Sequence, residues 1–366
     1  MYIKNLFLHN FRNYREQKVE FDHGINLLIG PNAQGKTNAL EAIYYLITGK
    51  SYRVRKENEL ILWGAKNFYL KSTFKVQDLL LNLESYYEPN KKIMKINQVP
   101  CRRLSDYVGT VNAVFFSPDD LEIIKNSPTE RRRFLDLLIS QLKPSHIALL
   151  NSYLKVLRQK KSLLRREIKT RAFKEELLVW NQQLVDIGSK IILNRLEFTK
   201  KLNEYALPIF QSIFPGDNTL ELVYYSLNRK DIEGVLADFS AILENKMAQE
   251  IERKTILVGP HRDDLLIEIN GRPARSFASQ GQQRVIVLCL KMAEMEIILN
   301  EKGEYPILLL DDVLSELDGK RRQYLLEYIY STRKQTIITM TEADDNIESE
   351  QATIFQVLQG KIRRCN

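Results

Sequence analysis

Cysteine, histidine and long apolar runs are scarce in this 366-residue sequence, and each shortage argues against a class of protein. The three cysteines, Cys101, Cys289 and Cys365, show no paired spacing, which is typical of free thiols in a reducing cytoplasm. Only four histidines are present, so a zinc site is disfavoured. No apolar run approaches the ~18–20 residues that span a membrane. The N-terminus interrupts its apolar residues with polar ones, unlike a secretion signal. We expect a cytoplasmic protein without a membrane partner.

Basic residues are concentrated in one segment. The net charge is +8, which favours polyanionic partners but does not identify one. Residues 128–171 contain 12 Lys and Arg against three acids, so this segment alone accounts for the excess. Arg131 to Arg133 lie beside a helix start, where we expect them to be structural or to lie at the junction of the helical lobe. Four others lie within two helical turns, and they form either a DNA-backbone contact or a solvated helix face. These four are Lys160, Lys161, Arg165 and Arg166.

The expected elements divide the chain into three segments. Residues 1–117 are mostly strands, with Asn97-Gln98 as a hairpin turn, and residues 118–254 are largely helical. One expected apolar stripe of the helical part is Ile147, Leu150, Leu154 and Leu157. Residues 255–366 return to alternating strands and helices, with a hairpin at Asn270-Gly271. We therefore expect an α/β domain in two parts, 1–117 and 255–366, with a helical lobe at 118–254 inserted between them.

The strongest motif is a glycine-rich loop between an apolar strand and a helix. It matches G-x-x-x-x-G-K-[ST], in which backbone N–H groups and a helix N-terminus surround phosphate. The lysine faces the β- and γ-phosphates of ATP, and the threonine hydroxyl is a ligand for Mg²⁺. The alternative, a chance glycine turn, does not account for the flanking strand and helix. The loop consists of Gly30, Pro31, Asn32, Ala33, Gln34, Gly35, Lys36 and Thr37.

A second motif is an apolar strand, Ile307–Leu310, that ends in Asp311 and Asp312. Such a strand delivers carboxylates to the sheet edge where α/β proteins bind ligands. We expect Asp311 to orient Mg²⁺ and Asp312 to act as the base that orients water. The alternative is that the two acids cap the next helix.

Two weaker motifs accompany these. Ser279, Gly281 and Gln282 stand at the start of an expected helix, where they form an anion site or a plain helix cap. Ser315-Glu316-Leu317-Asp318 follows the acidic pair, and capping of the helix after it is the alternative there.

The order of these four motifs resembles the ABC-type ATPases, in which two heads enclose two ATP molecules. Lys36 and Asp311 are 275 residues apart, more than transporter subunits require and less than chromosome-maintenance heads contain. Together with Asn10-Phe11-Arg12-Asn13-Tyr14 and Gly259-Pro260-His261-Arg262-Asp263-Asp264, this spacing resembles the RecF family. The resemblance implies an ABC-type P-loop ATPase head with a mixed sheet, in which Ser279, Gly281 and Gln282 contact the partner's nucleotide.

The resemblance further implies ATP and Mg²⁺ as cofactors, an ATP-dependent homodimer, and binding of single-stranded, gapped and double-stranded DNA. RecO and RecR are the implied protein partners, in DNA repair, RecA loading at gaps, replication restart and the SOS response. Two departures matter. Gln280 replaces the first signature glycine, and Asp312 stands where most ABC ATPases have glutamate. The shorter Asp312 reaches less far toward water, which predicts slow hydrolysis of ATP. Stimulation of this ATPase by DNA is what a DNA clamp would show.

The sequence is compatible with two roles for ATP. ATP either drives a DNA clamp whose release is timed by hydrolysis, or binds statically to a scaffold that recruits partners. A transporter subunit is disfavoured by the basic insertion. Arg12, Asn13 and Arg53 contact nucleotide or serve the fold, and Met340-Thr341 replaces the histidine that many ABC heads use to sense the γ-phosphate. The sequence assigns no role to residues 261–264.

Overall fold

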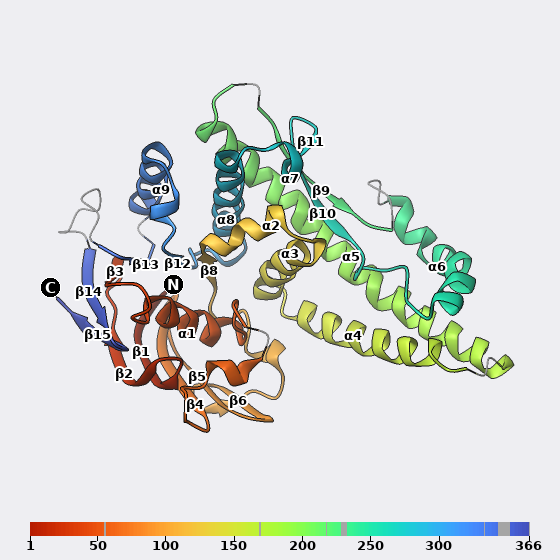
Figure 1. Ribbon diagram of the computed structural model, residues 1–366, viewed down its shortest axis with the longest axis horizontal. Helices are drawn as coiled ribbons and strands as arrows, with labels where there is room; N and C mark the ends of the chain where they lie inside the picture. Colours follow the sequence, from red (N-terminus) through yellow and green to blue (C-terminus); the bar gives the residue numbers. More distant parts are fainter. Residues whose placement is uncertain are drawn as a thin grey trace. The chain divides into compact units, whose positions relative to one another are not determined.

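The computed structural model (Figure 1) describes residues 1–54, 56–167, 170–216, 218–227, 233–332, 334–342 and 352–365. The chain forms two compact units. The first unit combines Met1–Leu121 with Arg284–Asn366, and the second unit is Glu122–Gln283. An insertion into a split α/β domain is therefore observed. Across the described residues, no helix has both the length and the apolar composition needed to cross a bilayer.

The first unit contains a mixed six-stranded sheet with the order β15-β14-β3-β13-β12-β8. All neighbouring strands in it are parallel except β15, which runs antiparallel to β14. Strands β12 and β13 are buried at every residue, because both faces of the sheet are covered. The strands are β3 (Ile25–Ile29), β8 (Ala113–Phe116), β12 (Ile307–Asp311), β13 (Thr336–Met340), β14 (Ala352–Leu358) and β15 (Lys361–Arg364).

A second, antiparallel sheet of the first unit has the order β2-β1-β4-β5-β6-β7. The expected turn at Asn97-Gln98 is confirmed, since both residues have positive φ, 49° and 70°, as a two-residue hairpin requires. The strands are β1 (Tyr2–Phe11), β2 (Tyr14–Glu20), β4 (Phe68–Val76), β5 (Leu79–Glu88), β6 (Lys91–Ile96) and β7 (Val99–Pro100).

Helix α1 (Lys36–Thr48) contacts strands of both sheets of the first unit, which is why nearly all of its side chains are buried. It ends at Gly49, whose φ of 68° forms the left-handed C-cap. The unit also contains most of α8 (Gln280–Lys302) and all of α9 (Gly319–Thr332). Its short 3₁₀ helices are η1 (Glu57–Leu60), η2 (Leu104–Asp106), η3 (Pro118–Leu121) and η4 (Leu314–Glu316).

The second unit is organised around the 43-residue helix α5 (Arg171–Ile213), which contacts α3, α4, α6 and β9. A three-stranded sheet with the order β11-β10-β9 completes the unit. The other helices are α2 (Glu122–Lys125), α3 (Pro128–Leu142), α4 (Ser145–Leu164), α6 (Glu233–Arg253) and α7 (Ala274–Phe277). The strands are β9 (Leu220–Tyr225), β10 (Asp264–Ile269) and β11 (Arg272–Pro273).

Two expectations about this lobe need correction. The expected lobe, 118–254, ends too early, because β9 lies inside it and pairs antiparallel with β10 over Asp264–Ile269. Because of this pairing, the second unit extends to Gln283. The expected apolar stripe of α4 is also misplaced. Leu154 is 46% exposed, whereas Tyr153 and Val156 are buried.

Candidate nucleotide-binding site

The glycine-rich loop joins β3 to α1 in a conformation that only a few residue types adopt. Ala33 and Gly35 have φ values of 64° and 119°, and α1 begins directly after Gly35, at Lys36. The first N–H groups of a helix have no intrahelical acceptor and carry its positive dipole end. The loop therefore presents backbone donors to an anion, as its sequence predicts.

Hydrogen bonds from two other parts of the chain hold the backbone of this loop. Asn13 Nδ2 donates to the Gln34 carbonyl at 2.9 Å, and the hydroxyl of Tyr14 donates to the Gly35 carbonyl, also at 2.9 Å. The N–H of Gly360, in the turn between β14 and β15, donates to the Gln34 carbonyl at 3.1 Å. Asn13 thus stabilises the loop backbone. Tyr14 and Gly360 also stabilise it, and the sequence did not predict this role for either of them.

The glycine at the start of the loop has no space for a side chain. A Cβ on Gly30 would lie 2.2 Å from the backbone oxygen of Val357. The start of the loop therefore packs directly against the backbone of β14, which fixes the position of the loop relative to the sheet.

Lys36 already points into the loop. Its Nζ donates to the carbonyls of Gly30 and Pro31 at 2.6 and 2.9 Å. Burial lowers the pKa of the Lys36 ammonium, and the negative charges of Asp312 and Asp311 oppose that shift. The same cation is thus close to the loop and to both acids at the end of β12.

Asp311 lies between two threonine hydroxyls. Its Oδ1 accepts hydrogen bonds from Thr37 Oγ1 and Thr339 Oγ1, each at 2.8 Å. Burial raises the pKa of the Asp311 carboxyl, and the two hydrogen bonds oppose that shift. Thr37 and Asp311, both predicted as metal ligands, are therefore brought together from opposite ends of the chain.

Thr339 also fixes the second acid. The N–H of Asp312 donates to Thr339 Oγ1 at 3.0 Å, and Asp312 has a φ of 54°. A left-handed conformation is uncommon outside glycine, asparagine and aspartate, so it marks a constrained position. The sequence did not identify Thr339, although parallel pairing places it opposite Asp311 in the register of β12 and β13.

The donor set fits Mg²⁺. The adjacent oxygens of Thr37 and Asp311 are hard ligands, and Mg²⁺ usually takes one or two protein oxygens and completes its shell with water and phosphate. Within the described parts of the chain, no group of three or more His, Cys, Asp or Glu side chains has the spacing of a metal site. Thr37 and Asp311 could thus supply two oxygens to a magnesium ion.

Arg12 and Arg53 are engaged with other side chains. The guanidinium of Arg12 forms two hydrogen bonds, 2.8 and 2.9 Å long, with the fully buried carboxylate of Glu41. Arg53 donates to Asn38 Oδ1 at 3.2 Å. The Arg12 contact supports the structural alternative for that residue.

The candidate signature segment forms a helix cap within the second unit. Ser279 Oγ accepts from the N–H of Gln282 at 3.2 Å, and Gln282 Oε1 accepts from the N–H of Ser279 at 2.8 Å. This reciprocal pair is a capping box at the start of α8. Ser279 is exposed, and Gly281 and Gln282 are half-buried. Their part in nucleotide binding stays a prediction.

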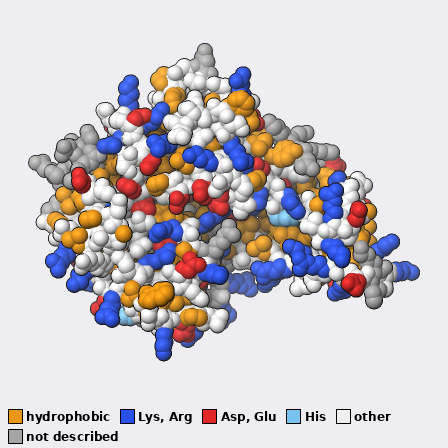
Figure 2. All heavy atoms as spheres, in the orientation of Figure 1, with side chains coloured by type: hydrophobic (Ala, Val, Ile, Leu, Met, Phe, Trp, Pro, Cys, Tyr) orange, Lys and Arg blue, Asp and Glu red, His pale blue; other side chains and the backbone are white. Residues whose placement is uncertain are grey.

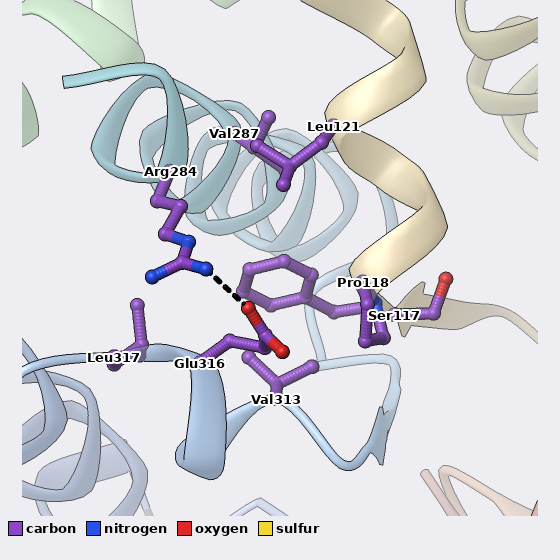
Figure 3. Close-up of a pocket in the computed structure, with 9 residues that line it drawn as sticks. Ser117, Pro118, Leu121, Arg284, Val287, Val313, Glu316 and Leu317 are labelled. Atoms are coloured by element: carbon purple, nitrogen blue, oxygen red, sulfur yellow. Dashed lines mark hydrogen bonds and ion pairs between the residues drawn. The ribbon is translucent and has the colours of Figure 1, made fainter. Parts of the chain in front are cut away.

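The segment after the acidic pair lines an apolar pocket of the first unit (Figure 3). Glu316 pairs with Arg284 of α8, and Val313 and Leu317 contribute apolar lining. Asp318 Oδ1 accepts from the N–H of Arg321 at 3.1 Å, which is the expected capping of α9. The Glu316–Arg284 pair thus connects the end of β12 to the helix that follows the signature.

The four candidate DNA contacts do not share one environment. Lys161, Arg165 and Arg166 are exposed. Lys160 is fully buried, and its Nζ lies 2.6 Å from Glu250 Oε2, which is also fully buried. The prediction that Lys160 contacts DNA is therefore wrong, because a buried, paired ammonium cannot reach a phosphate.

A structural role is confirmed for two arginines near the start of α3. Arg131 forms two hydrogen bonds, of 2.7 and 2.9 Å, with Asp264. Arg132 donates to the carbonyl of Asp263 at 2.6 Å.

Comparisons with known proteins agree with this geometry. The family model described as RecF/RecN/SMC N terminal domain matches residues 2–363. A "DNA replication and repair protein RecF" of Desulfitobacterium hafniense is 52% identical over 365 residues and covers all of both chains. The protein of that name from Bacillus subtilis is 39% identical, with 99% of this chain and all of the relative covered.

Comparisons with solved structures agree with these sequence matches. The structure titled "recombination mediator protein RecF-ATP in RecFOR pathway" has a TM-score of 0.92 and 34% identity, and covers all of this chain and 98% of that one. A Pyrococcus furiosus Smc head has a TM-score of 0.56 and 16% identity, covers all of this chain and 96% of that one, and supports the fold alone.

Proposed function

The chain belongs to the RecF family, and from this membership we propose that it is an ATP-dependent DNA-binding protein of recombinational repair. In this proposal it acts in the cytoplasm with RecO and RecR, helps to load RecA at gaps, and serves replication restart and the SOS response. The solved relative described as a recombination mediator protein in the RecFOR pathway supports the choice of partners.

The observation that carries the ATPase proposal is the Thr37–Asp311–Thr339 cluster beside Lys36. Loop N–H groups and Lys36 bind the phosphates, while Thr37 and Asp311 supply oxygens to a magnesium ion, which neutralises phosphate charge when bound. Asp312 accepts the proton of the attacking water. Its side chain is one methylene shorter than the usual glutamate, which supports slow hydrolysis.

The signature residues support an ATP-dependent homodimer. Ser279 is exposed at the N-terminus of α8, so its hydroxyl and the positive end of the helix dipole are accessible to an anion from outside. In the proposed dimer, Ser279, Gly281 and Gln282 of each protomer contact the nucleotide bound to its partner. Closing the dimer would then require ATP, and hydrolysis would release it.

Replacing Ser279 with arginine is expected to leave ATP binding to one protomer intact and to abolish both ATP-dependent dimerisation and hydrolysis. The large side chain would occupy the space of the partner's phosphate. The lost cap costs only ~1 kcal/mol, so α8 should remain folded. Sedimentation with and without ATP measures the dimer, and Ser276→Arg, at another exposed serine, is the matched control. A normal ATP-dependent dimer of Ser279→Arg would rule out the two-head arrangement.

The exposed basic residues of the second unit support a DNA contact. Figure 2 shows Lys and Arg side chains gathered over the outer part of α4 and the start of α5. Lys161 and Arg165 are exposed there, and Arg166 is exposed although it lies 2.8 Å from Glu176. Contacts of this kind bind the phosphate backbone and do not read bases.

Reversing Lys161, Arg165 and Arg166 to glutamate is expected to weaken DNA binding equally on all sequences. It should also remove the stimulation of ATP hydrolysis by DNA. Each lost phosphate contact flattens the dependence of log K on log salt by about 0.9, so the slope should change by up to about 3. A salt titration of the ATP-bound protein measures this change.

The matched control reverses Lys125, Lys190 and Lys200, which are also exposed and lie in the same unit. ATP affinity should be unchanged in both variants. An equal slope for the test variant and the control would move the DNA surface away from α4. If DNA binds without changing the ATPase rate of the unmodified protein, the scaffold alternative is favoured over the clamp.

A further inference from the structure

The turn Gly259–Asp264 in the second unit is held by buried polar groups from distant parts of the chain. Arg195 of α5 donates to the Pro260 carbonyl at 2.7 Å. The hydroxyl of Tyr153 in α4 lies 2.9 Å from His261 Nδ1. Burial lowers the pKa of His261 to about 4, so the ring is neutral near pH 7. The turn is therefore fixed without a charge on its histidine.

Both aspartates of the turn are committed to the fold. Asp264 accepts two hydrogen bonds from Arg131, and Asp263 Oδ2 accepts from the hydroxyls of Tyr224 and Ser226 at 2.6 and 2.8 Å. Burying charged groups costs more free energy than burying apolar side chains of similar volume. A network of buried charges is therefore expected where it holds a functional group in position.

Gly259 stands where the turn packs closely against Tyr153. Its φ is 129°, and a Cβ there would lie 2.3 Å from the hydroxyl of Tyr153. The turn therefore requires glycine at this position, because any side chain would collide with Tyr153.

Arg262 is the one member of residues 261–264 that is exposed. Its Nε and one Nη donate to the Ile256 carbonyl at 3.3 and 3.0 Å, which fixes the plane of the guanidinium. A guanidinium has five N–H donors, so others remain for a ligand. The rigid turn thus presents an oriented arginine at the surface of the second unit.

Arg262 lines a cavity of about 220 Å³ that lies wholly within the second unit. Two further cations, Lys246 and Arg253 of α6, line the same cavity. Asp263 is the single carboxylate among the described lining residues. Lys246 Nζ lies 3.3 Å from Gln249 Oε1, and Gln249 also lines the cavity. Three cations against one carboxylate favour an anionic ligand.

We propose that this cavity binds a terminal phosphate group, either the phosphomonoester at the end of a nucleic-acid strand or free inorganic phosphate. The guanidinium geometry of Arg262 and Arg253 suits two or more phosphate oxygens at once. A terminal phosphate carries up to two negative charges and can enter a concavity. A backbone diester carries one charge and is flanked by sugars on both sides. The site is distinct from the loop at Gly30–Thr37 and does not depend on ATP.

The test compares two single-stranded oligonucleotides that differ only in a 5′-phosphate or a 5′-hydroxyl, bound to the full chain without nucleotide. Fluorescence anisotropy should show about tenfold tighter binding of the phosphorylated strand. Arg262→Gln and Arg253→Gln should each reduce the ratio of the two affinities toward one. Lys254→Gln, which neutralises an exposed neighbour outside the cavity lining, should leave it unchanged.

Contacts of basic surfaces with the part common to both strands cancel in this ratio, and the two cavity variants separate the cavity from general attraction to the added charge. Competition by inorganic phosphate that removes the preference would identify the free anion as a sufficient ligand. A preference that inorganic phosphate does not reduce would limit the site to strand ends. Equal affinities for the two strands, or a preference that survives in both cavity variants, would overturn the proposal. Arg262→Gln changes an exposed side chain, and Arg253→Gln lies at the end of α6. If one of the two variants fails to fold, the other still tests the proposal.

Discussion

Replacing Lys36 with methionine is expected to weaken ATP binding by about 100-fold or more. Hydrogen bonds to a charged group contribute about 1.5–3 kcal/mol, and a loss of 2.7 kcal/mol corresponds to about 100-fold in affinity. Methionine fills nearly the same space but has no charge and no donor. Lys36 Nζ also bridges the carbonyls of Gly30 and Pro31, so the variant loses part of the preformed loop as well.

Equilibrium titration with ATP and Mg²⁺ measures this loss directly. Thermal unfolding gives a second readout, because a ligand that binds only the folded state raises the unfolding temperature. That rise should disappear in Lys36→Met and persist in Lys50→Met, where an exposed lysine just beyond α1 is changed in the same way. An unchanged ATP affinity in Lys36→Met would remove this lysine from the site.

The elements that the sequence predicts best are those whose signals are local. The loop from Gly30 to Thr37 lies between strand and helix as expected, because glycines, a buried strand and a helix start occur within a few residues of one another. The hairpins at Asn97-Gln98 and Asn270-Gly271 are confirmed for the same reason. The apolar run before Asp311 is strand β12, which lies between β13 and the edge strand β8 of a largely parallel sheet.

Features that depend on long-range contacts were missed. On α4 both the expected stripe and the true buried face recur at helical spacing, and the buried face includes Lys160. The residues near Lys160 in the sequence do not indicate its partner, Glu250, because Glu250 lies in another helix. The same holds for β9, a short strand within a helical region that only its pairing with β10 reveals.

The candidate site shows the same division. Thr37, Asp311 and Asp312 were found from motifs, whereas Thr339 and Tyr14 act through contacts with residues far away in the sequence. Thr339 donates to one acid and accepts from the backbone of the next, so a single side chain sets the geometry of both. Predicting it requires knowing that β13 lies beside β12 and in which register.

Replacing Asp312 with asparagine is expected to leave ATP binding within about twofold and to reduce single-turnover hydrolysis by about 10²–10⁴-fold, the range that a general base contributes. Asparagine has the same size but cannot accept the proton of the attacking water. It is also among the few residues that tolerate a φ of 54°, so the N–H bond to Thr339 should persist.

The informative comparison is with Asp311→Asn, because the two acids are adjacent but are proposed to act differently. Asp311 accepts from Thr37 and Thr339, and losing its charge should weaken the dependence of ATP binding on Mg²⁺. Asp312→Asn should keep that dependence and lose the chemical step alone. Rapid-quench measurement with enzyme in excess separates the two, since it reports hydrolysis independently of product release. Wild-type single-turnover hydrolysis in Asp312→Asn would assign the base to another residue, whereas loss of Mg²⁺-dependent binding in that variant would make Asp312 a metal ligand instead.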